Sequence, residues 1–230
     1  MSPLKSQLQQ RFRAGNVWRQ NLVYQDEEDD LDEMTDLCFE RNEISIADWR
    51  LKKDLGQPLI QLDAETPPVE VTVDRISNQF RDNITGEIVW DRVRDLLHEE
   101  FYIDEYDTKV KAGNAVGCIR RFLFEASEND TVLVNTSHGT AMAVFDGPAV
   151  YEPDQPQAKI DRSHVFRRPI KFMHDESGDI ITFDSSELPQ PLKPNKMTMT
   201  GVNRDDLQTV LKQAEALTTL ADTMTLVDGH

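Results

Sequence analysis

The sequence has few of the features that mark exported or membrane-bound proteins. Its two cysteines, Cys38 and Cys118, are too few for a disulfide framework and lack metal-ligand spacing. No run of about 18 apolar residues is present, so no transmembrane helix is predicted. The opening residues, MSPLKSQLQQRFR, lack the apolar core of a signal peptide. We therefore expect a soluble, cytoplasmic protein with no membrane partner.

Motifs for catalysis are also lacking. The sequence contains no Gly-rich phosphate loop, no HExxH, no paired CxxC and no Asp…Glu-x-Lys set following a strand. The five histidines are scattered along the chain, and Cys118 has the apolar neighbours of a core residue. We therefore predict a protein that is not an enzyme and that has no cofactor and no metal site.

Positive charge is scarce, since 25 Lys and Arg stand against 42 Asp and Glu, for a net charge of -17. An excess of negative charge keeps a protein dispersed in solution. It also suits a halophilic protein, because salt screens the repulsion between its own carboxylates. A third interpretation is a DNA mimic, in which carboxylates imitate phosphates. Acidity disfavours nucleic-acid binding because that binding uses cationic contacts, but this argument weakens at high salt.

The pattern of hydrophobic and polar residues divides the chain into four parts. Residues 1–16 are polar and predict an N-terminal arm, and residues 17–186 predict an α+β domain, a small mixed β-barrel flanked by helices. Residues 187–202 contain three prolines and predict a linker. Residues 203–224 carry leucines at helical spacing and predict an amphipathic C-terminal helix, which either packs on the domain or mediates self-association.

Strand and helix patterns alternate within the predicted domain. Short apolar or alternating runs predict strands over 17–24, 44–47, 69–73, 131–134, 141–145, 164–172 and 180–183. Apolar residues at helical spacing predict helices from the acidic run 26–33 onward, over 87–101 and over 116–124.

Four short motifs occur in a fixed order: Ile44–Trp49, Arg121–Glu125, Asn129–Val134 and His164–Phe172. Their order and spacing resemble the EVE-like domain found at the N-terminus of Mrr-type restriction proteins, within the wider PUA, YTH and SRA superfamily. In that family one strand reads I-x-I-G-W, a helix carries F-x-x-E, the next strand follows G-D-x-V, and a late strand reads H-x-R-x-V-x-W. The resemblance covers residues 17–175, roughly two-thirds of the chain.

The chain departs from the family pattern at three places. Ala47-Asp48 replaces the usual Gly, Asn129-Asp130 replaces Gly-Asp, and Phe172 replaces the closing Trp. Even so, the resemblance implies a domain of PUA-like type and a non-catalytic reader of DNA or RNA, acting in restriction or phage defence on a modified base. A base flipped into a pocket requires an aromatic wall and polar groups for its edge.

The resemblance and the residue chemistry together indicate two sets of candidate residues. Those expected to bind the base are Asp48, Trp49, Arg50, Asn114, Asn135, Thr136, Ser137, Tyr151 and His164. Those expected to contact the nucleic-acid backbone as a local basic patch are Arg120, Arg121, Arg167, Arg168 and Lys171. Structural roles compete with these: Trp49 in the core or at its rim, Asn114 as a helix cap, and His164 with Arg167 as supports of the late strand.

The resemblance implies DNA or RNA as a partner. In the family this module is usually fused to a nuclease, so either a nuclease or other effector encoded separately acts with this chain, or the amphipathic C-terminal helix supplies a homo-oligomer or docking contact. Two other functions stay open on sequence grounds. One is an acidic interaction protein without a nucleic-acid ligand, either a DNA mimic or a partner-docking module, and the other is a small nucleotide sensor that uses the same pocket.

Overall fold

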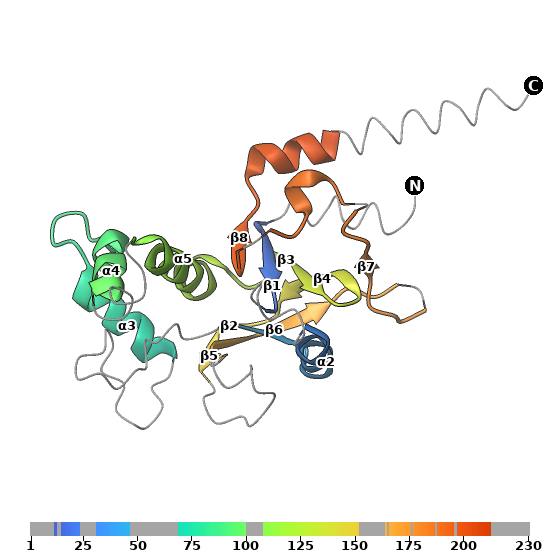
Figure 1. Ribbon diagram of the computed structural model, residues 1–230, viewed down its shortest axis with the longest axis horizontal. Helices are drawn as coiled ribbons and strands as arrows, with labels where there is room; N and C mark the ends of the chain where they lie inside the picture. Colours follow the sequence, from blue (N-terminus) through green and yellow to red (C-terminus); the bar gives the residue numbers. More distant parts are fainter. Residues whose placement is uncertain are drawn as a thin grey trace, which may run out of the picture.

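The computed structural model describes residues 12, 15–23, 31–46, 69–99, 108–151, 164, 166–175, 177–186, 188–195 and 197–212. Within these ranges the protein is a mixed α+β structure, in which a curled sheet is accompanied by helices (Figure 1). This confirms the predicted α+β class, whereas the assignment to the PUA-like type stays a prediction. No helix in these ranges is long and apolar enough to cross a membrane.

Six strands form the sheet in the order β2-β6-β4-β3-β1-β8, while β5 pairs with β6 and β7 pairs with β4. Strands β1 and β3 run parallel, and the other pairs are antiparallel. The strands are β1 (Val17–Asn21), β2 (Glu43–Ile46), β3 (Thr131–Thr136), β4 (Gly139–Phe145), β5 (Val150–Tyr151), β6 (Phe166–Phe172), β7 (Thr182–Phe183) and β8 (Met199–Gly201).

The helices lie around this sheet in separate groups. In Figure 1, α3, α4 and α5 gather at the left, α2 lies beside β2 and β6, and the helix of residues 204–212 lies at the top. The named helices are α2 (Leu31–Arg41), α3 (Val69–Phe80), α4 (Trp90–Leu97), α5 (Val110–Ile119), the π-helix η3 (Arg120–Glu125) and the 3-10 helix η5 (Gln190–Leu192).

Helix α2 and the β3–β4 hairpin follow directly from local sequence. In α2, Met34 and Cys38 are buried four residues apart, and Asn42 ends the helix with a φ of 54°, a left-handed conformation that asparagine tolerates. In the hairpin, Gly139 has a φ of 111°, and a Cβ there would lie 2.6 Å from the carbonyl oxygen of Phe183. Only glycine fits at this point, where β7 approaches the start of β4.

Two hydrophobic cores lie on the two faces of the sheet. Alternation along β1 sends Trp18 into the larger core and Val17 into the smaller one. The smaller core also contains Leu207 and Val210 from helix 204–212, which are 3% and 8% exposed. The described first turns of the C-terminal helix therefore pack back on the domain, one of the two outcomes that the sequence left open.

Two predictions differ from the structure. Residues 69–73 form the first turns of α3 and not a strand, because Val73, Ile76 and Phe80 repeat at helical spacing and pack on the larger core. Residues 187–202 are not simply a linker, because their described part includes η5 and strand β8, which pairs with β1. Met199 is fully buried there, so this segment completes the edge of the sheet.

Candidate functional site

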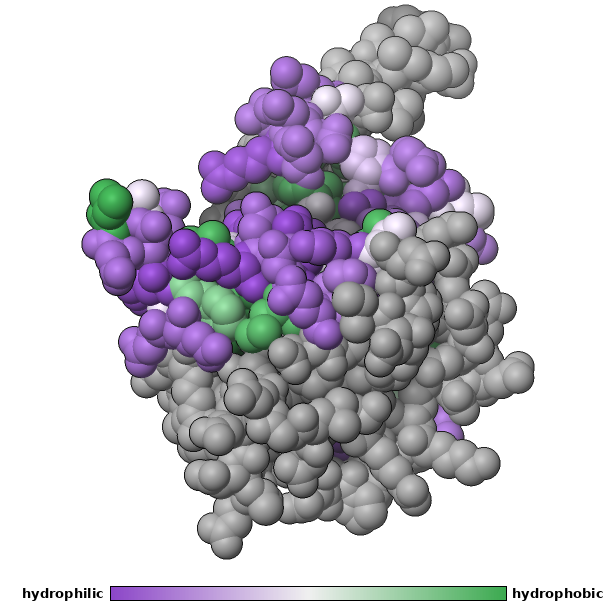
Figure 2. Space-filling view, turned by 60° about the vertical axis from the view of Figure 1, so that its left-hand side comes forward, coloured by the Kyte–Doolittle hydropathy of each residue, from purple (hydrophilic) through white to green (hydrophobic). Residues whose placement is uncertain are grey.

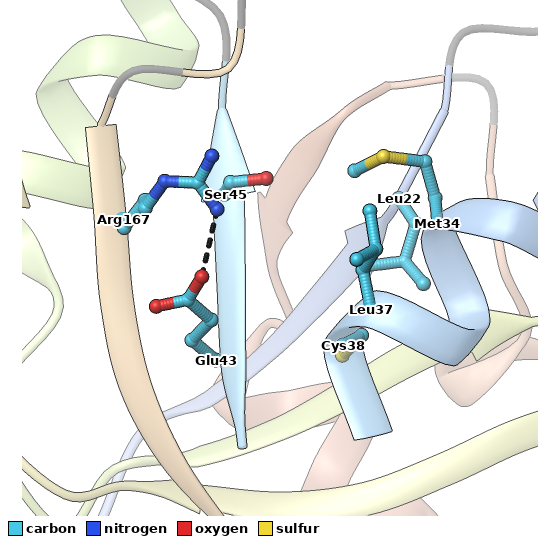
Figure 3. A pocket seen from close by; sticks show the side chains of 7 residues that line it. All are labelled: Leu22, Met34, Leu37, Cys38, Glu43, Ser45 and Arg167. Atoms are coloured by element: carbon cyan, nitrogen blue, oxygen red, sulfur yellow. Dashed lines mark hydrogen bonds and ion pairs between the residues drawn. The ribbon is translucent and has the colours of Figure 1, made fainter. Parts of the chain in front are cut away.

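The candidate site is a polar cluster between β2 and β6. The two strands pair so that Ser45 lies opposite Arg167, and Ile44 lies opposite Arg168. Because alternate side chains point to opposite faces of a strand, Ser45 and Arg167 share one face with Glu43. Figure 3 shows these three side chains meeting beside β2, across a gap from α2.

The charged part of the cluster is centred on the carboxylate of Glu43. Arg167 Nη1 donates to Glu43 Oε1 at 2.7 Å, and the Arg167 side chain is 3% exposed. Arg41 Nη1 lies 3.3 Å from the same carboxylate oxygen, so Glu43 is shared by two guanidinium groups. A buried charge is tolerated only when it is paired in this way.

The neutral part of the cluster joins a serine to a histidine. Ser45 Oγ lies 3.1 Å from His164 Nδ1, and both side chains are buried. Burial lowers the pKa of His164 to about 4, with the nearby charge of Arg167 acting in the same direction. The imidazole is therefore neutral at pH 7, with one nitrogen able to donate a hydrogen bond and the other able to accept one.

A narrow pocket opens between this cluster and α2. Its volume of about 10 Å³ has room for about one water molecule. The pocket has a polar wall and an apolar wall, as Figure 3 shows; it is lined by Glu43, Ser45 and Arg167 on one side and by Leu22, Met34, Leu37 and Cys38 on the other. Burial, followed by the charge of Glu43, raises the pKa of the Cys38 thiol, which suppresses thiolate formation and nucleophilic reactivity.

A glutamine from the neighbouring part of the sheet reaches the same cluster. Gln20 Nε2 donates to the backbone oxygens of Asn21 at 3.0 Å and of Ser45 at 3.4 Å. Its Oε1 is buried and has no hydrogen-bond partner among the described residues. A buried amide oxygen in this situation accepts a bond from a water or from a ligand N–H group.

The structure brings together only some of the predicted base-binding residues. His164 joins Arg167 in the cluster, while Asp48, Trp49 and Arg50 lie outside the described residues. Tyr151 lies in β5, and its side chain is likewise outside the description.

Three further candidates lie at the β3–β4 turn, near α2. Thr136 Oγ1 donates to the Gly139 oxygen at 2.7 Å, and the backbone N–H of Ser137 donates to Thr35 Oγ1 of α2 at 3.0 Å. Asn135 is half-buried at the end of β3. This turn is therefore tied to the helix that lines the pocket, through Thr35, which is not itself one of the lining residues.

Asn114 lies elsewhere, inside a helix. Helix α5 begins at Val110, with Lys109 at the N-cap position, so Asn114 does not cap it. The alternative role of a helix cap is excluded because the helix extends further toward the N-terminus, through Lys111 and Ala112, which are good helix formers, while the base-binding role of Asn114 stays a prediction.

The five predicted basic residues do not form one surface patch. Arg167 and Arg168 are buried, with Arg168 donating to the oxygens of Gly147 and Phe122 at 3.0 and 2.9 Å. The prediction was wrong for these two because distant segments supply their partners. Two of the others make contacts within the protein, since Arg121 donates to the Met199 oxygen and Arg120 pairs with Glu125. Lys171 is exposed on β6.

Sequence reasoning missed Gln20, Glu43 and Ser45 as members of the cluster. A signal was present for two of them, because Glu43 and Ser45 alternate with Ile44 and Ile46 along β2. Both isoleucines are buried in the larger core, so the polar pair had to face the other side. Nothing local to Gln20 indicated its approach to β2.

Oxygen, nitrogen and hydroxyl groups are available at this site for hydrogen bonding. In the part of the chain that the structure describes, no group of three or more His, Cys, Asp and Glu side chains could hold a metal ion.

Comparison of the chain with protein families, with curated proteins and with solved structures finds no match in any of the three.

Proposed function

We propose that this protein is a non-catalytic reader of DNA or RNA. Side chains of the polar cluster between β2 and β6 would recognise a base by hydrogen bonding to its edge. In this proposal it is an EVE-like domain of PUA-like type that acts in the cytoplasm, in restriction or phage defence, with a separately encoded effector. The observation that carries the proposal is the buried set of Ser45, neutral His164 and the Glu43–Arg167 pair beside a small pocket.

The energetic cost of this set supports a binding role. Burying polar groups and an ion pair between two strands is rarely more stable than filling the same space with apolar side chains. A set that combines a neutral donor and acceptor with a fixed guanidinium matches what a base edge offers, namely carbonyl, ring nitrogen and amino groups.

The size of the pocket limits how a base is held. A volume of about 10 Å³ admits a water or a single protruding group, and not a whole ring. We therefore propose that the base stacks on Trp49, which follows β2 closely in sequence, and directs its edge or a modifying group toward Ser45 and Arg167.

The first test is a binding titration of the full chain with fluorescent oligonucleotides, single- and double-stranded, with unmodified, methylated or hydroxymethylated bases. It is run by fluorescence anisotropy over a series of KCl concentrations, because nucleic-acid affinity depends on salt. The proposal expects one modified oligonucleotide to bind more tightly than its unmodified counterpart. Equal affinity for all of them would contradict base reading.

The second test removes one group from the cluster. Ser45→Ala deletes the hydroxyl that meets His164 and is expected to reduce discrimination between modified and unmodified bases by about ten-fold, as loss of one buried hydrogen bond does. Ser177→Ala, on an exposed turn, is the matched control and is expected to leave binding unchanged.

Trp49→Ala is expected to weaken binding of every oligonucleotide. Unchanged affinity in Trp49→Ala would contradict the stacking contact.

One observation favours a second function, that of an acidic interaction protein. Arg167 and Arg168 are buried, so two cations expected at the phosphates are used inside the fold of a chain with a net charge of -17. A DNA mimic would displace a labelled duplex from a lysine-rich DNA-binding peptide. Polyglutamate of equal total charge is the control, and displacement no better than that of polyglutamate would contradict the mimic.

A further inference from the structure

A second feature with the chemistry of base recognition lies away from the cluster, where α4 meets η3. The Arg120 guanidinium carbon lies 5.6 Å from the centre of the Trp90 ring, and Trp90 meets Phe124 edge-to-face at 5.0 Å between ring centres. Arg120 Nε also donates to Glu125 Oε1 at 2.6 Å. We refer to Trp90, Arg120, Phe124 and Glu125 as the Trp90–Arg120 stack.

The stack holds a flat cation in place while leaving part of it in solvent. Trp90 supports the guanidinium through its ring, and Glu125 fixes it from the side, so the plane of Arg120 is restrained before any ligand arrives. The Arg120 side chain is nevertheless 47% exposed. Arginine planes presented in this way are surfaces on which unpaired bases stack.

The chain segment that carries Arg120 differs in charge from the rest of the chain, although α4, which carries Trp90, contributes Asp91 and Asp95, and Asp95 pairs with Lys109. Residues 108–124 include four basic residues and no acidic one, although the whole chain has 42 acidic residues. The one carboxylate in the stack, that of Glu125, is paired with Arg120 itself. In the coloured part of the face that comes forward in Figure 2, hydrophilic residues surround a small apolar area.

We propose that the Trp90–Arg120 stack binds an unpaired base of single-stranded nucleic acid, which lies on the outer face of the Arg120 guanidinium. This inference rests on the proposed function, to which it adds a second contact on the same strand. The site takes any base, because stacking uses the ring face and not the hydrogen-bonding edge. It therefore contributes affinity, while the cluster at β2 and β6 contributes selectivity.

The experiment separates stacking from charge by replacing Arg120 with lysine. Arg120→Lys keeps the positive charge and loses the plane, so the slope of log affinity against log salt stays unchanged while affinity for a single-stranded oligonucleotide falls by roughly ten-fold. Arg92→Lys, an exposed arginine on α4, is the matched control and is expected to bind like the wild type. Affinities are measured by fluorescence anisotropy, with circular dichroism melting to show that each variant is folded.

A change in the oligonucleotide completes the cycle. An abasic site walked along a strand with the recognised base at a fixed position is expected to weaken wild-type binding at one position besides that of the recognised base. At this second position it is expected to have no further effect in Arg120→Lys, because both changes remove the same contact. Arg120→Lys binding as tightly as the wild type would overturn the stack and leave the reader intact. Binding that depends on Arg120 but is unaffected by Ser45→Ala, with no base discrimination, would support the stack and overturn the cluster. A folded wild-type protein that binds no oligonucleotide would overturn both.

Discussion

Two buried polar centres in this protein are built in different ways. At the start of β3, the single carboxylate of Asp130 accepts bonds from the backbone N–H groups of Asn16 and Ser127, from Asn16 Nδ2 and from Trp18 Nε1, at 2.9 to 3.3 Å. Both oxygens of this carboxylate therefore have hydrogen-bond donors supplied by the protein.

The cluster at β2 and β6 differs because it is not closed. It borders a pocket with room for about one water, its histidine is neutral, and the Gln20 oxygen nearby has no partner among the described residues. Burial of polar groups therefore serves two different purposes in this fold. Around Asp130 it joins β1 to the loop before β3, whereas at Ser45 it leaves hydrogen-bonding groups beside a pocket.

The largest expected effect breaks the closed centre. Asp130→Ala leaves the indole N–H of Trp18 and two backbone N–H groups without their acceptor, and is expected to lower the free energy of unfolding by about 4 kcal/mol. Urea denaturation at pH 7 measures it. Asp146→Ala, at an exposed position directly after β4, serves as control. An equal loss of unfolding free energy in both variants would contradict the special role of Asp130.

The next effect concerns the pH dependence of the open cluster. The pKa of His164 is about 4 in the folded protein, against 6.5 in the unfolded chain, so the unfolded state takes up a proton first as the pH falls. The contribution of neutral His164 to the free energy of unfolding is therefore fully present above pH 6.5. It declines below that pH, by about 3 kcal/mol between pH 7 and pH 4. Urea denaturation of His164→Asn across this range is expected to lack that component. His174→Asn, at an exposed histidine, should retain it.

A smaller effect follows from unbalancing the ion pair. Glu43→Gln removes the negative partner of a buried guanidinium, while Arg41, a second cation, lies nearby, and is expected to lower the free energy of unfolding by about 2 kcal/mol. Part of the loss should be recovered in the double variant Glu43→Gln with Arg167→Met, because the buried guanidinium is then removed together with its carboxylate partner. Purely additive losses in denaturation experiments would show that the pair is not coupled.

The smallest effect tests the unpaired oxygen. Gln20→Met removes two weak donor contacts together with an acceptor that has no described partner, so stability is expected to change by less than about 0.5 kcal/mol. Thermal denaturation measures it. A loss near that of Asp130→Ala would indicate that the Gln20 oxygen is satisfied by a fixed water and that the cluster is closed after all.

Much of the fold could be predicted because its signals are local. The alternation Glu43-Ile44-Ser45-Ile46 and the apolar run in β3 both gave strands where strands are found. Strand β8 escaped prediction because Met199 lies in a short, polar, proline-preceded segment whose pairing with β1 depends on residues far away. The start of α3 was mistaken because its first five residues alternate like a strand, and only Ile76 and Phe80 reveal the helical period.

The candidate site was harder to predict for the same physical reason. Arg167 and Arg168 read as a cationic pair in sequence, yet adjacent residues on a strand point to opposite faces. One meets Glu43 and the other meets the carbonyl groups of Gly147 and Phe122, both supplied by distant segments. His164 was predicted as a contact residue, and its partner Ser45 became visible only through the pairing of β2 with β6.

The position of β1 between β3 and β8 has a consequence for how the protein folds. Val17 pairs with Thr131, and Gln20 pairs with Met199, so both neighbours of this strand lie more than a hundred residues away along the chain. Contacts of such long separation close large loops and slow the search for the native state. During synthesis, β1 leaves the ribosome early and must wait for both partners, exposing Trp18 and Leu22 meanwhile. Folding of this sheet is therefore expected to be late, cooperative and dependent on protection of its first strand.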